Sequence, residues 1–323
     1  AGARLVDLGR HRLRDLPEPE HVSQIAAPGL RHDFPPILSQ AGIGNLPQAT
    51  TRFVGRDSDV DDLVARLERA RLLTIAGAGG VGKTRLSLEV AARAPGFGDG
   101  AWFVELAPVN DPALVAEAVC ATVGAPAIGD GAAFDRLVDH LRGRRMLIVL
   151  DNCEHLVAAA ADLAHRILRE TTGATILANS REALGVPGEE IWRVGGLDEP
   201  PEIDDDDLPL ATAMTYGAMQ LFVDRAELAA GGRWRMSQAE VAPVAHICQR
   251  LDGIPLALEL AAARMKMMTA RQIAARIGDR FALLTRGARV HLPRQQTLTA
   301  LYDWSYNLLE PHEQAMFRRL SVF

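Results

Sequence analysis

The residues with the clearest chemical role form a glycine-rich run that ends in lysine and threonine. Residues 75–86 read IAGAGGVGKTRL, and Gly77 to Thr84 fit the spacing G-x-x-x-x-G-K-[ST] after an apolar run. Glycine admits backbone angles that other residues avoid, so successive N–H groups can turn inward around an anion. The chain has 35 Lys plus Arg residues but only two lysines, Lys83 and Lys266. A slender ammonium suits a tight phosphate loop better than a planar guanidinium, which indicates that Lys83 is chemically required.

This run predicts a nucleotide site with a magnesium ion. We expect the loop amides and Lys83 to hold the phosphates of ATP or ADP, with the positive end of the following helix directed at them. We expect Thr84 to place its hydroxyl on Mg²⁺. The predicted cofactor-binding residues of the loop are Gly77, Gly79, Gly80, Val81, Gly82, Lys83, Thr84 and Arg85.

A second metal residue follows an apolar run further along the chain. Residues 146–151 read MLIVLD, so Asp151 ends a buried strand, where ligands of open parallel sheets bind. We predict that Asp151 and Thr84 hold the metal; the alternative for Asp151 is a strand-end cap. Many P-loop ATPases carry a second acid directly after the first, but Asn152 occupies that position. Glu154 is the nearest carboxylate and either polarises water or stabilises a helix N-terminus, so we expect slow ATP hydrolysis.

Alternating strand and helix patterns surround these residues and predict an α/β fold, a P-loop NTPase parallel sheet flanked by helices. The predicted strands are RLLTIAG, GAWFVEL, RRMLIVLDN, ATILANS and EEIWRV. The predicted helices are DVDDLVARLERA, KTRLSLEVAARA, DPALVAEAVCATVG and EHLVAAAADLAHRILRE. The third helix carries its own signals, with Asp111 as N-cap, Pro112 in the first position and Gly124 after the end. Strands alternating with helices favour a parallel sheet covered on both faces.

The strand patterns stop at an acidic loop, residues 198–210, and helical patterns follow. Its four consecutive aspartates are interpreted as a solvated loop, with a metal cage as the weaker alternative. Four helical segments then predict an all-α helical domain, and two further helices reach the last residue. We therefore expect four parts, 1–50, 51–208, 209–288 and 289–323. The first is Pro-rich linker with one short strand, and the last is the start of another domain.

Composition narrows the class of protein. Hydrophobic residues make up 48% and charged residues 24%, as in an ordinary globular protein, and the net charge is −6. That charge argues against a surface that grips nucleic acid or anionic membrane, and no apolar run approaches the length of a membrane span. Cys120, Cys153 and Cys248 match no metal or disulfide spacing. We expect them to be buried thiols in a cytoplasmic protein.

Several separated stretches resemble one family. They are NLPQATTRFVGRDSDVDDL, which contains an hhGR signature, LTIAGAGGVGKTRLSLEVA, LIVLDNCEHL, ILANSREALGVPGEEIWRV and LDGIPLALELAAAR. In order and spacing they resemble STAND-class P-loop ATPases with an NB-ARC-type core, as in bacterial multidomain LuxR-type transcriptional regulators. The resemblance covers about residues 46–323.

The resemblance implies roles for further residues. In that family the hhGR residues bracket adenine, an arginine at a strand end senses the γ-phosphate, and a G-x-P turn of the helical domain backs the adenine pocket. The matching residues are Phe53, Val54, Gly55, Arg56, Arg181, Pro255 and Leu256. Arg181 has a surface strand-end residue as its alternative. The predicted catalytic residues are thus Lys83, Asp151, Glu154 and Arg181.

Two features depart from the family pattern, and a third extends the resemblance beyond it. Asp57 stands where the hhGR motif is usually followed by Glu. The resemblance implies that the winged-helix histidine, which some relatives use to read a bound diphosphate, would lie beyond residue 323. We therefore expect 289–323 to match only the opening of a winged-helix domain. At the other end, LVDLGRHRLRDLPEPEHVSQIAAPGLRHDFPP resembles the close of a class III adenylyl cyclase domain. Residues 1–50 are therefore expected to end an upstream cyclase-like domain and form a linker.

The prediction is an ATP/ADP-binding signalling switch in a multidomain transcriptional regulator. Slow Mg-dependent ATP hydrolysis would control the arrangement of its domains. The alternative is a P-loop kinase or phosphotransferase acting on a small substrate, although the sequence shows neither a lid motif nor an acceptor-binding cluster. A DNA-binding protein in its own right is disfavoured by the acidic balance. The expected ligand is an adenine nucleotide, and self-association is possible when ATP is bound. We expect DNA to be contacted only through modules outside this chain, and we expect no membrane partner.

Overall fold

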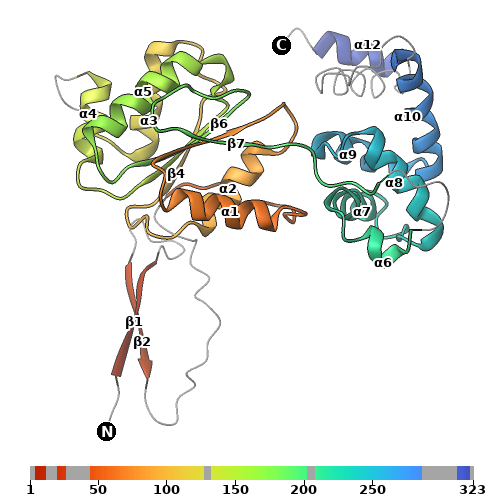
Figure 1. Cartoon of the computed structure of the whole chain (residues 1–323), viewed down its shortest axis with the longest axis horizontal. Coiled ribbons are helices and arrows are strands. Elements are labelled where there is room, and N and C mark those ends of the chain that lie inside the picture. The colour runs from red at the N-terminus through yellow and green to blue at the C-terminus, as the bar shows by residue number, and fades with distance from the viewer. Residues whose placement is uncertain are drawn as a thin grey trace. The chain divides into compact units, whose positions relative to one another are not determined.

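The computed structural model describes residues 4–11, 20–26, 44–126, 132–201, 208–285 and 311–320 (Figure 1). The chain divides into two compact units. The sheet unit consists of Ala1–Thr51, Ser58–Ala76 and Thr84–Arg193. The helical unit consists of Arg52–Asp57, Gly77–Lys83 and Val194–Phe323. The chain therefore passes from one unit to the other within the glycine-rich loop, between Lys83 and Thr84.

A five-stranded parallel sheet forms the centre of the sheet unit, as predicted. Its strands are β3 (Leu72–Ala76), β4 (Ala101–Glu105), β5 (Leu147–Asp151), β6 (Thr175–Ser180) and β7 (Glu190–Arg193). Their order is β4-β5-β6-β3-β7, and all neighbours run parallel. The central strands β3, β5 and β6 are buried along their whole length, because helices cover both faces of the sheet.

The helices of this unit fall into two groups. They are α1 (Asp57–Leu67), α2 (Lys83–Arg93), α3 (Val115–Val123), α4 (Ala133–Leu141) and α5 (Val157–Glu170). Apolar side chains of α3, α4 and α5 form one core cluster with the same face of the sheet, including Leu72, Ile148 and Ile176. The alternate strand residues, such as Leu73 and Ile75, point to the other face, which α1 and α2 cover (Figure 1).

The signals that predicted the third helix are confirmed. The Asp111 side chain accepts a hydrogen bond from the Ala113 amide at 2.9 Å, and Pro112 opens the first turn. That turn is a short 3₁₀ segment, Pro112–Leu114, which leads directly into α3. Gly124 ends α3 in the left-handed conformation, with φ 74°.

The helical unit contains the four predicted helical segments. Its helices are α6 (Leu210–Ala213), α7 (Gly217–Ala229), α8 (Val241–Arg250), α9 (Pro255–Ala262) and α10 (Ala270–Thr285). Their buried faces form one apolar core, with Phe222 of α7 fully buried in it. Gly253 adopts φ 58° before α9, and Pro255 occupies the first position of that helix.

Three further elements lie near the two ends of the sequence. Strand β1 (Arg4–His11) pairs antiparallel with β2 (Glu20–Ala26), and only the second strand was predicted. Helix α12 (Pro311–Leu320) matches the last predicted helix. The four aspartates of the acidic loop and the helix predicted at 296–309 lie outside the described residues.

The composition also led to expectations about the cysteines and about membrane-spanning helices. The three cysteines Cys120, Cys153 and Cys248 are buried, as expected, and their thiols are free. Of the helices in the described ranges, none combines the length and the apolar character that crossing a membrane would require.

Candidate functional site

The glycine-rich loop has the predicted position, directly after β3 and opening α2 at Lys83. Gly80 and Gly82 adopt φ values of 76° and 89°, which residues with a side chain rarely adopt. The Lys83 ammonium donates hydrogen bonds to the carbonyl oxygens of Gly77 at 3.0 Å and Ala78 at 3.1 Å. The loop therefore holds its lysine side chain against its own backbone.

Gly77 and Gly79 of the loop differ in whether packing against other protein atoms requires a glycine. A Cβ atom at Gly77 would lie 2.6 Å from the Val194 carbonyl oxygen, so packing of the chain demands glycine there. A Cβ atom at Gly79 would meet no protein atom within 4 Å, and Gly79 has no positive φ. Packing does not require glycine at 79, whereas close approach of a phosphate to the backbone would. The loop thus fits a polyphosphate ligand.

Thr84 and Asp151 meet within the sheet unit. The exposed Thr84 donates its hydroxyl hydrogen to Oδ1 of Asp151 at 2.8 Å, since a carboxylate can only accept. The lone pairs of the threonine oxygen remain available for a cation. Mg²⁺ prefers oxygen ligands and is commonly held by one or two carboxylates together with phosphates. One carboxylate beside one hydroxyl oxygen therefore fits a Mg²⁺ ion that also binds phosphates. Within the described ranges no three His, Cys, Asp or Glu side chains gather as a metal cage.

Two residues that were not predicted join this pair. Asn179, at the end of β6, donates from Nδ2 to Asp151 Oδ1 at 2.6 Å and to Ser87 Oγ at 2.8 Å. Ser87 in turn donates to the backbone carbonyl of Thr84 at 2.9 Å. Asn179 and Ser87 have no exposed surface. The carboxylate is therefore held from both the sheet and the helix.

Sequence signals for both residues existed. Ser87 lies three positions after Thr84, which places the two on one face of a helix. Leu150 of β5 pairs with Ala178 of β6, so the next residues along both strands are neighbours on the same sheet face. The first signal is visible in the sequence alone. The second needs the strand order, which the sequence does not show.

The predicted water-activating residue and the predicted γ-phosphate sensor form an ion pair. Arg181 Nε lies 3.5 Å from Glu154 Oε1, and the side chains are 56% and 20% exposed. The second oxygen of Glu154 is buried and has no hydrogen-bond partner within the described residues. Asn152, between Asp151 and this turn, adopts φ 65° and lets the chain reverse after β5. The structure thus brings both candidate residues together at the ends of β5 and β6.

The thiol of Cys153 lies close to these carboxylates but is not suited to chemistry. Burial first, and then the negative charges of Asp151 and Glu154, raise the pKa of Cys153 to about 12. The group therefore stays a protonated thiol at neutral pH. A thiol is a poor nucleophile and a poor metal ligand compared with a thiolate.

Within the helical unit, the hhGR arginine lies close to the loop. Arg56 is 6% exposed, and its guanidinium donates to the Gly195 carbonyl at 2.6 Å. A Cβ atom at Gly82 would lie 3.9 Å from Arg56 Nη1 and 3.8 Å from Pro255 Cγ. Arg56, Gly82 and Pro255, which were predicted from three separate motifs, therefore lie together.

The G-x-P turn contacts the loop through its backbone. The Leu256 amide donates to the Gly80 carbonyl at 3.2 Å. Gly55 adopts φ 76°, and a Cβ atom there would lie 2.6 Å from the Gly217 Cα, so the chain must carry glycine at this crossing. Val54 packs against the helical core and Phe53 is half-buried. Their predicted contact with adenine stays a prediction.

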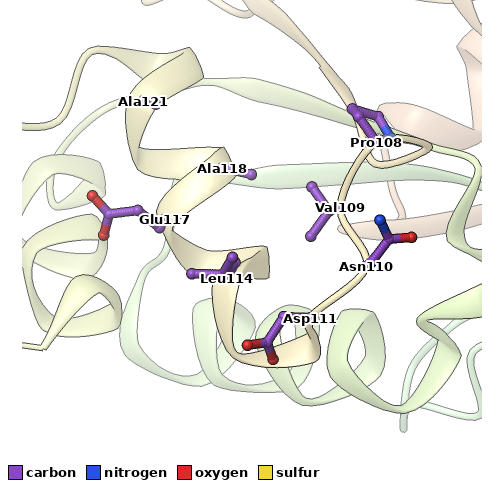
Figure 2. Close-up of a pocket in the computed structure, with 8 residues that line it drawn as sticks. All are labelled: Pro108, Val109, Asn110, Asp111, Leu114, Glu117, Ala118 and Ala121. Atoms are coloured by element: carbon purple, nitrogen blue, oxygen red, sulfur yellow. The ribbon is translucent and has the colours of Figure 1, made fainter.

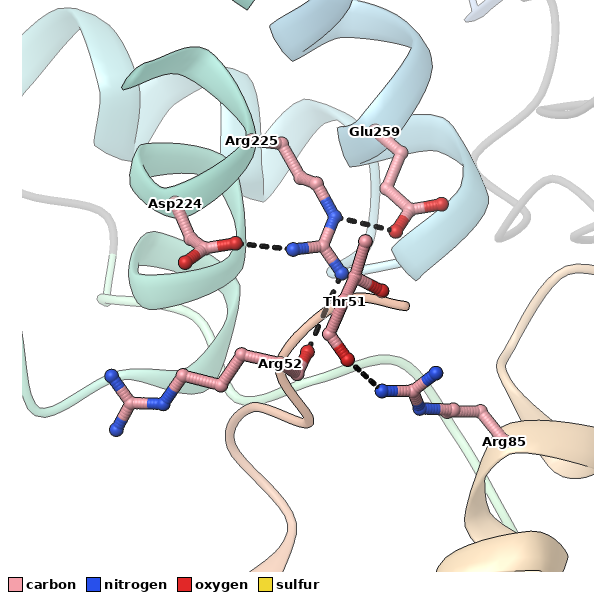
Figure 3. A network of polar contacts seen from close by, with 6 residues as sticks. All are labelled: Thr51, Arg52, Arg85, Asp224, Arg225 and Glu259. Atoms are coloured by element: carbon pink, nitrogen blue, oxygen red, sulfur yellow. Dashed lines mark hydrogen bonds and ion pairs between the residues drawn. The ribbon is translucent and has the colours of Figure 1, made fainter. Parts of the chain in front are cut away.

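Arginines bind two consecutive carbonyl groups ahead of the hhGR motif (Figure 3). In the sheet unit Arg85 donates to the Thr51 carbonyl. In the helical unit Arg225 donates to the Arg52 carbonyl at 3.5 Å and to Glu259 at 2.9 Å. Arg85 therefore has a structural contact in addition to its predicted role in nucleotide binding, which stays a prediction.

A separate pocket lies between the loop after β4 and helix α3 (Figure 2). Its volume is about 480 Å³. It is lined by Pro108, Val109, Asn110, Asp111, Leu114, Glu117, Ala118 and Ala121. None of the predicted site residues lines this pocket, so it is distinct from the candidate nucleotide site.

Sequence comparisons agree with the P-loop geometry. Residues 65–186 match the family model of the AAA domain, so the chain carries a P-loop ATPase domain of that type. A Mycobacterium tuberculosis protein named "Putative HTH-type transcriptional regulator" is 43% identical over 259 residues, 80% of this chain. That match covers 27% of the relative, so the chain spans about a quarter of its length. An uncharacterised M. tuberculosis protein is 38% identical over 274 residues, which are 84% of this chain and 66% of that protein.

Solved structures with a similar fold are more distant. The Signal Transduction ATPase with Numerous Domains (STAND) protein with a tetratricopeptide repeat sensor from Pyrococcus horikoshii aligns with a TM-score of 0.48 and 14% identity. The alignment covers 86% of this chain and 35% of that protein. A Walker-type ATPase of Pyrococcus abyssi aligns with a TM-score of 0.46 and 13% identity, over 80% of this chain and 92% of that one. Neither likeness is close enough to bear on function.

Proposed function

We propose that this chain is the ATP- and ADP-binding switch module of a multidomain transcriptional regulator of the STAND class, with an NB-ARC-type core as in LuxR-type regulators. The observation that carries the proposal is the hydrogen bond from Thr84 to Asp151 at 2.8 Å, directly after a glycine-rich loop with its lysine. A threonine whose proton is committed to a strand-end carboxylate offers its oxygen to Mg²⁺. The relatives named as transcriptional regulators support the wider role.

Each site residue has a proposed part. Lys83 and the loop amides bind the phosphates, and Thr84 and Asp151 hold Mg²⁺, which neutralises charge on the phosphates. Arg181 senses the γ-phosphate and Glu154 polarises the attacking water. Arg181 engages one oxygen of Glu154 at 3.5 Å, and we expect slow turnover because this carboxylate must leave the ion pair to bind a water molecule.

The switch depends on contacts between the loop and the rest of the helical unit. Leu256 donates to the carbonyl of Gly80, and Arg56 and Pro255 lie next to the position of a Gly82 side chain. A nucleotide that shifts the loop therefore acts on the first turn of α9. ATP and ADP favour different domain arrangements only as far as their affinities for those arrangements differ.

The wider assignment is also a proposal. We assign 1–50 to the end of an upstream cyclase-like domain and a linker, 51–208 to nucleotide binding, 209–288 to the helical domain and 289–323 to the start of a winged helix. DNA would be bound by modules outside this chain, and the ATP-bound form would self-associate.

Hydrolysis and exchange measurements with purified protein test the proposal. We expect ATP turnover below about 1 per second, the low end for ordinary enzymes, and no stimulation by phosphate acceptors. We also expect ATP and ADP to give different amide hydrogen-exchange protection in the first turn of α9. Strong acceptor-dependent turnover would instead indicate a P-loop kinase, and identical protection with both nucleotides would contradict a switch.

A further inference from the structure

A closed ring of hydrogen bonds surrounds the carboxylate at the end of β5. Thr84 Oγ1 and Asn179 Nδ2 both donate to Asp151 Oδ1, at 2.8 Å and 2.6 Å. Asn179 also donates to Ser87 Oγ at 2.8 Å, and Ser87 donates to the Thr84 carbonyl at 2.9 Å. The ring links β5, β6 and the first turn of α2. Each of its members contacts two others.

Elementary chemistry fixes the direction of every bond in this ring. A carboxylate and a carbonyl only accept, so Thr84 must donate to Asp151 and Ser87 must donate to the Thr84 carbonyl. The Ser87 hydroxyl has then used its hydrogen and must accept from Asn179. The amide nitrogen, not the amide oxygen, therefore faces Asp151. Oδ1 of the aspartate accepts twice, which leaves Oδ2 to face a metal shell.

Packing alone does not account for an asparagine at this position. Asn179 has no exposed surface, and its Oδ1 is buried with no hydrogen-bond partner within the described residues. A buried acceptor without a partner is costly, and leucine of similar size would avoid that cost. The two bonds made by the amide nitrogen are what distinguishes asparagine from leucine here. One of them is to the predicted metal residue.

Thr74 provides a comparison on the same sheet. It also has no exposed surface, and its hydroxyl oxygen has no hydrogen-bond partner among the residues that the structure describes. Thr74 lies on β3 and pairs with Ala178, so it points to the face opposite Asn179. It makes no hydrogen bond to the ring around Asp151. The two residues share burial and an unpartnered oxygen but differ in contact with the ring.

We propose that Asn179 is a positioning residue that orients the Asp151 carboxylate for Mg²⁺, and that Ser87 holds the Asn179 amide in place. This inference rests on the proposed function, because it assumes that Asp151 serves the nucleotide-bound metal. Outer partners of a metal-binding carboxylate set its orientation, and their loss commonly lowers metal affinity about 10–100-fold. Asn179 therefore contributes to the metal dependence of ADP binding and not to binding without metal.

Three variants of the full chain test the proposal by calorimetric ADP titration in EDTA and at a series of Mg²⁺ concentrations. Asn179→Leu is expected to raise the Mg²⁺ concentration at half-effect at least about tenfold, with ADP affinity in EDTA unchanged within about twofold. Ser87→Ala is expected to raise the Mg²⁺ concentration at half-effect by a smaller factor. Thr74→Val, the matched control, is expected to leave both quantities unchanged.

Asn179→Asp adds a signature that loss of stability would not produce. Its carboxyl donates a hydrogen bond to Asp151 when protonated and repels Asp151 when ionised. The Mg²⁺ half-effect concentration of this variant is therefore expected to approach that of the original protein as the pH is lowered. Asn179→Leu has no such group and is expected to keep its defect across the same pH range.

Each outcome decides the matter. An unchanged Mg²⁺ half-effect concentration in folded Asn179→Leu would overturn the proposal. A shift of equal size in Thr74→Val would also overturn it, because the cause would then be general loss of core stability. If circular dichroism shows that Asn179→Leu does not fold, Ser87→Ala and the pH response of Asn179→Asp decide instead. If the original protein binds no ADP even with Mg²⁺, the proposed function fails and this inference with it.

Discussion

The sheet unit and the helical unit bury different kinds of side chain. The buried polar residues of the sheet unit are Thr74, Ser87, Asp151, Thr171, Thr175, Asn179 and Ser180. In the helical unit, among side chains that the structure describes, Arg56 is the buried polar residue, and the remaining core is apolar. Buried polar groups are costly unless they are paired, and Asn179 pairs with both Ser87 and Asp151 in the sheet unit.

The helical unit, which includes Gly77–Lys83 of the glycine-rich loop, contacts that loop through backbone groups. The Leu256 amide binds the Gly80 carbonyl, and the Gly195 carbonyl accepts from Arg56. Each of these two contacts uses a backbone group of the unit, whose core is apolar. Among the predicted site residues, the sheet unit carries Thr84, Asp151 and Arg181, and the helical unit carries Lys83 and Arg56. Substitutions should therefore have different consequences in the two units.

The largest effect is expected from removing core volume in the helical unit. Phe222 has no exposed surface, and Phe222→Ala is expected to lower the free energy of unfolding of this unit by about 3–5 kcal/mol. Hydrogen exchange should show loss of protection in α7 to α10, with β3, β5 and β6 unchanged. Leu228→Ala on the same helix, where the leucine is 65% exposed, is the control and should cost under about 0.5 kcal/mol. Equal loss of protection in the strands would contradict separate units.

Asp151→Asn perturbs the chemistry of the sheet unit instead. The amide keeps the shape of the side chain but removes the negative charge that a metal requires. We expect Mg²⁺ affinity in the ADP complex to fall by at least about 10–100-fold, the range for loss of outer partners. Asp162→Asn, an exposed carboxylate on α5, is the matched control in the same titration and should change nothing. Unaltered Mg²⁺ dependence in Asp151→Asn would remove this residue from the metal site.

A smaller effect is expected from a substitution in the glycine-rich loop, whose residues Gly77–Lys83 belong to the helical unit. Gly79→Ala adds a methyl group that meets no protein atom within 4 Å, so the melting temperature should not fall. The methyl group would obstruct phosphate approach, and we expect ADP affinity to fall about tenfold, or about 1.4 kcal/mol. Gly98→Ala, where a Cβ atom also meets nothing within 4 Å, should leave affinity unchanged. Equal affinities for both variants would show that the backbone at 79 is not approached.

The smallest effect concerns an acid in the helical unit. Burial first, and then the charge of Asp252, raise the pKa of Glu199 from 4.5 to about 7. The folded form therefore holds a proton that the unfolded form has lost, and stability falls as the pH rises from about 4.5 to about 7. Glu199 is partly exposed, so the effect is small.

Thermal melts of Glu199→Gln measure this effect. Above pH 7 the variant is expected to melt a degree or two higher than the original protein, roughly the shift that a fraction of a kcal/mol produces. Between the two pKa values the advantage should shrink as the pH falls. Asp198→Asn, the exposed neighbour, should follow the original protein at each pH. An advantage for Glu199→Gln that does not vary with pH would contradict titration of this carboxyl.

The elements with local signals could be predicted from the sequence. An apolar run ending in Gly77 predicted β3, the change to helical spacing at Lys83 predicted α2, and the run before Asp151 predicted β5. Asp111 and Gly124 marked the limits of the third predicted helix, which comprises the turn Pro112–Leu114 and α3. Each of these signals depends on residues within one or two turns of the chain, so no knowledge of packing was needed.

The features that the sequence did not predict either have weak local signals or depend on contacts between residues that are distant in sequence. Helix α4 begins after Ala132, whose side chain caps nothing, so its start had no marker. The hydrogen bond from Asn179 to Asp151 requires β5 and β6 to be neighbours, which only the folded sheet determines. The bond from the Leu256 amide to the loop involves no side chain at all. A hydrogen bond between two backbone groups does not require a particular residue type, so the sequence gives no signal for it.

Calorimetric titration of the chain with Mg²⁺ and ADP tests the central claim most directly. The sequence contains only two lysines, so Lys266→Ala, in an exposed position of the helical unit, is a matched control for Lys83→Ala. We predict binding by the original protein and by Lys266→Ala with equal affinity. Lys83→Ala should bind about 100-fold more weakly, consistent with loss of charged hydrogen bonds. No heat of binding with the original protein, or equal binding by Lys83→Ala, would contradict the account.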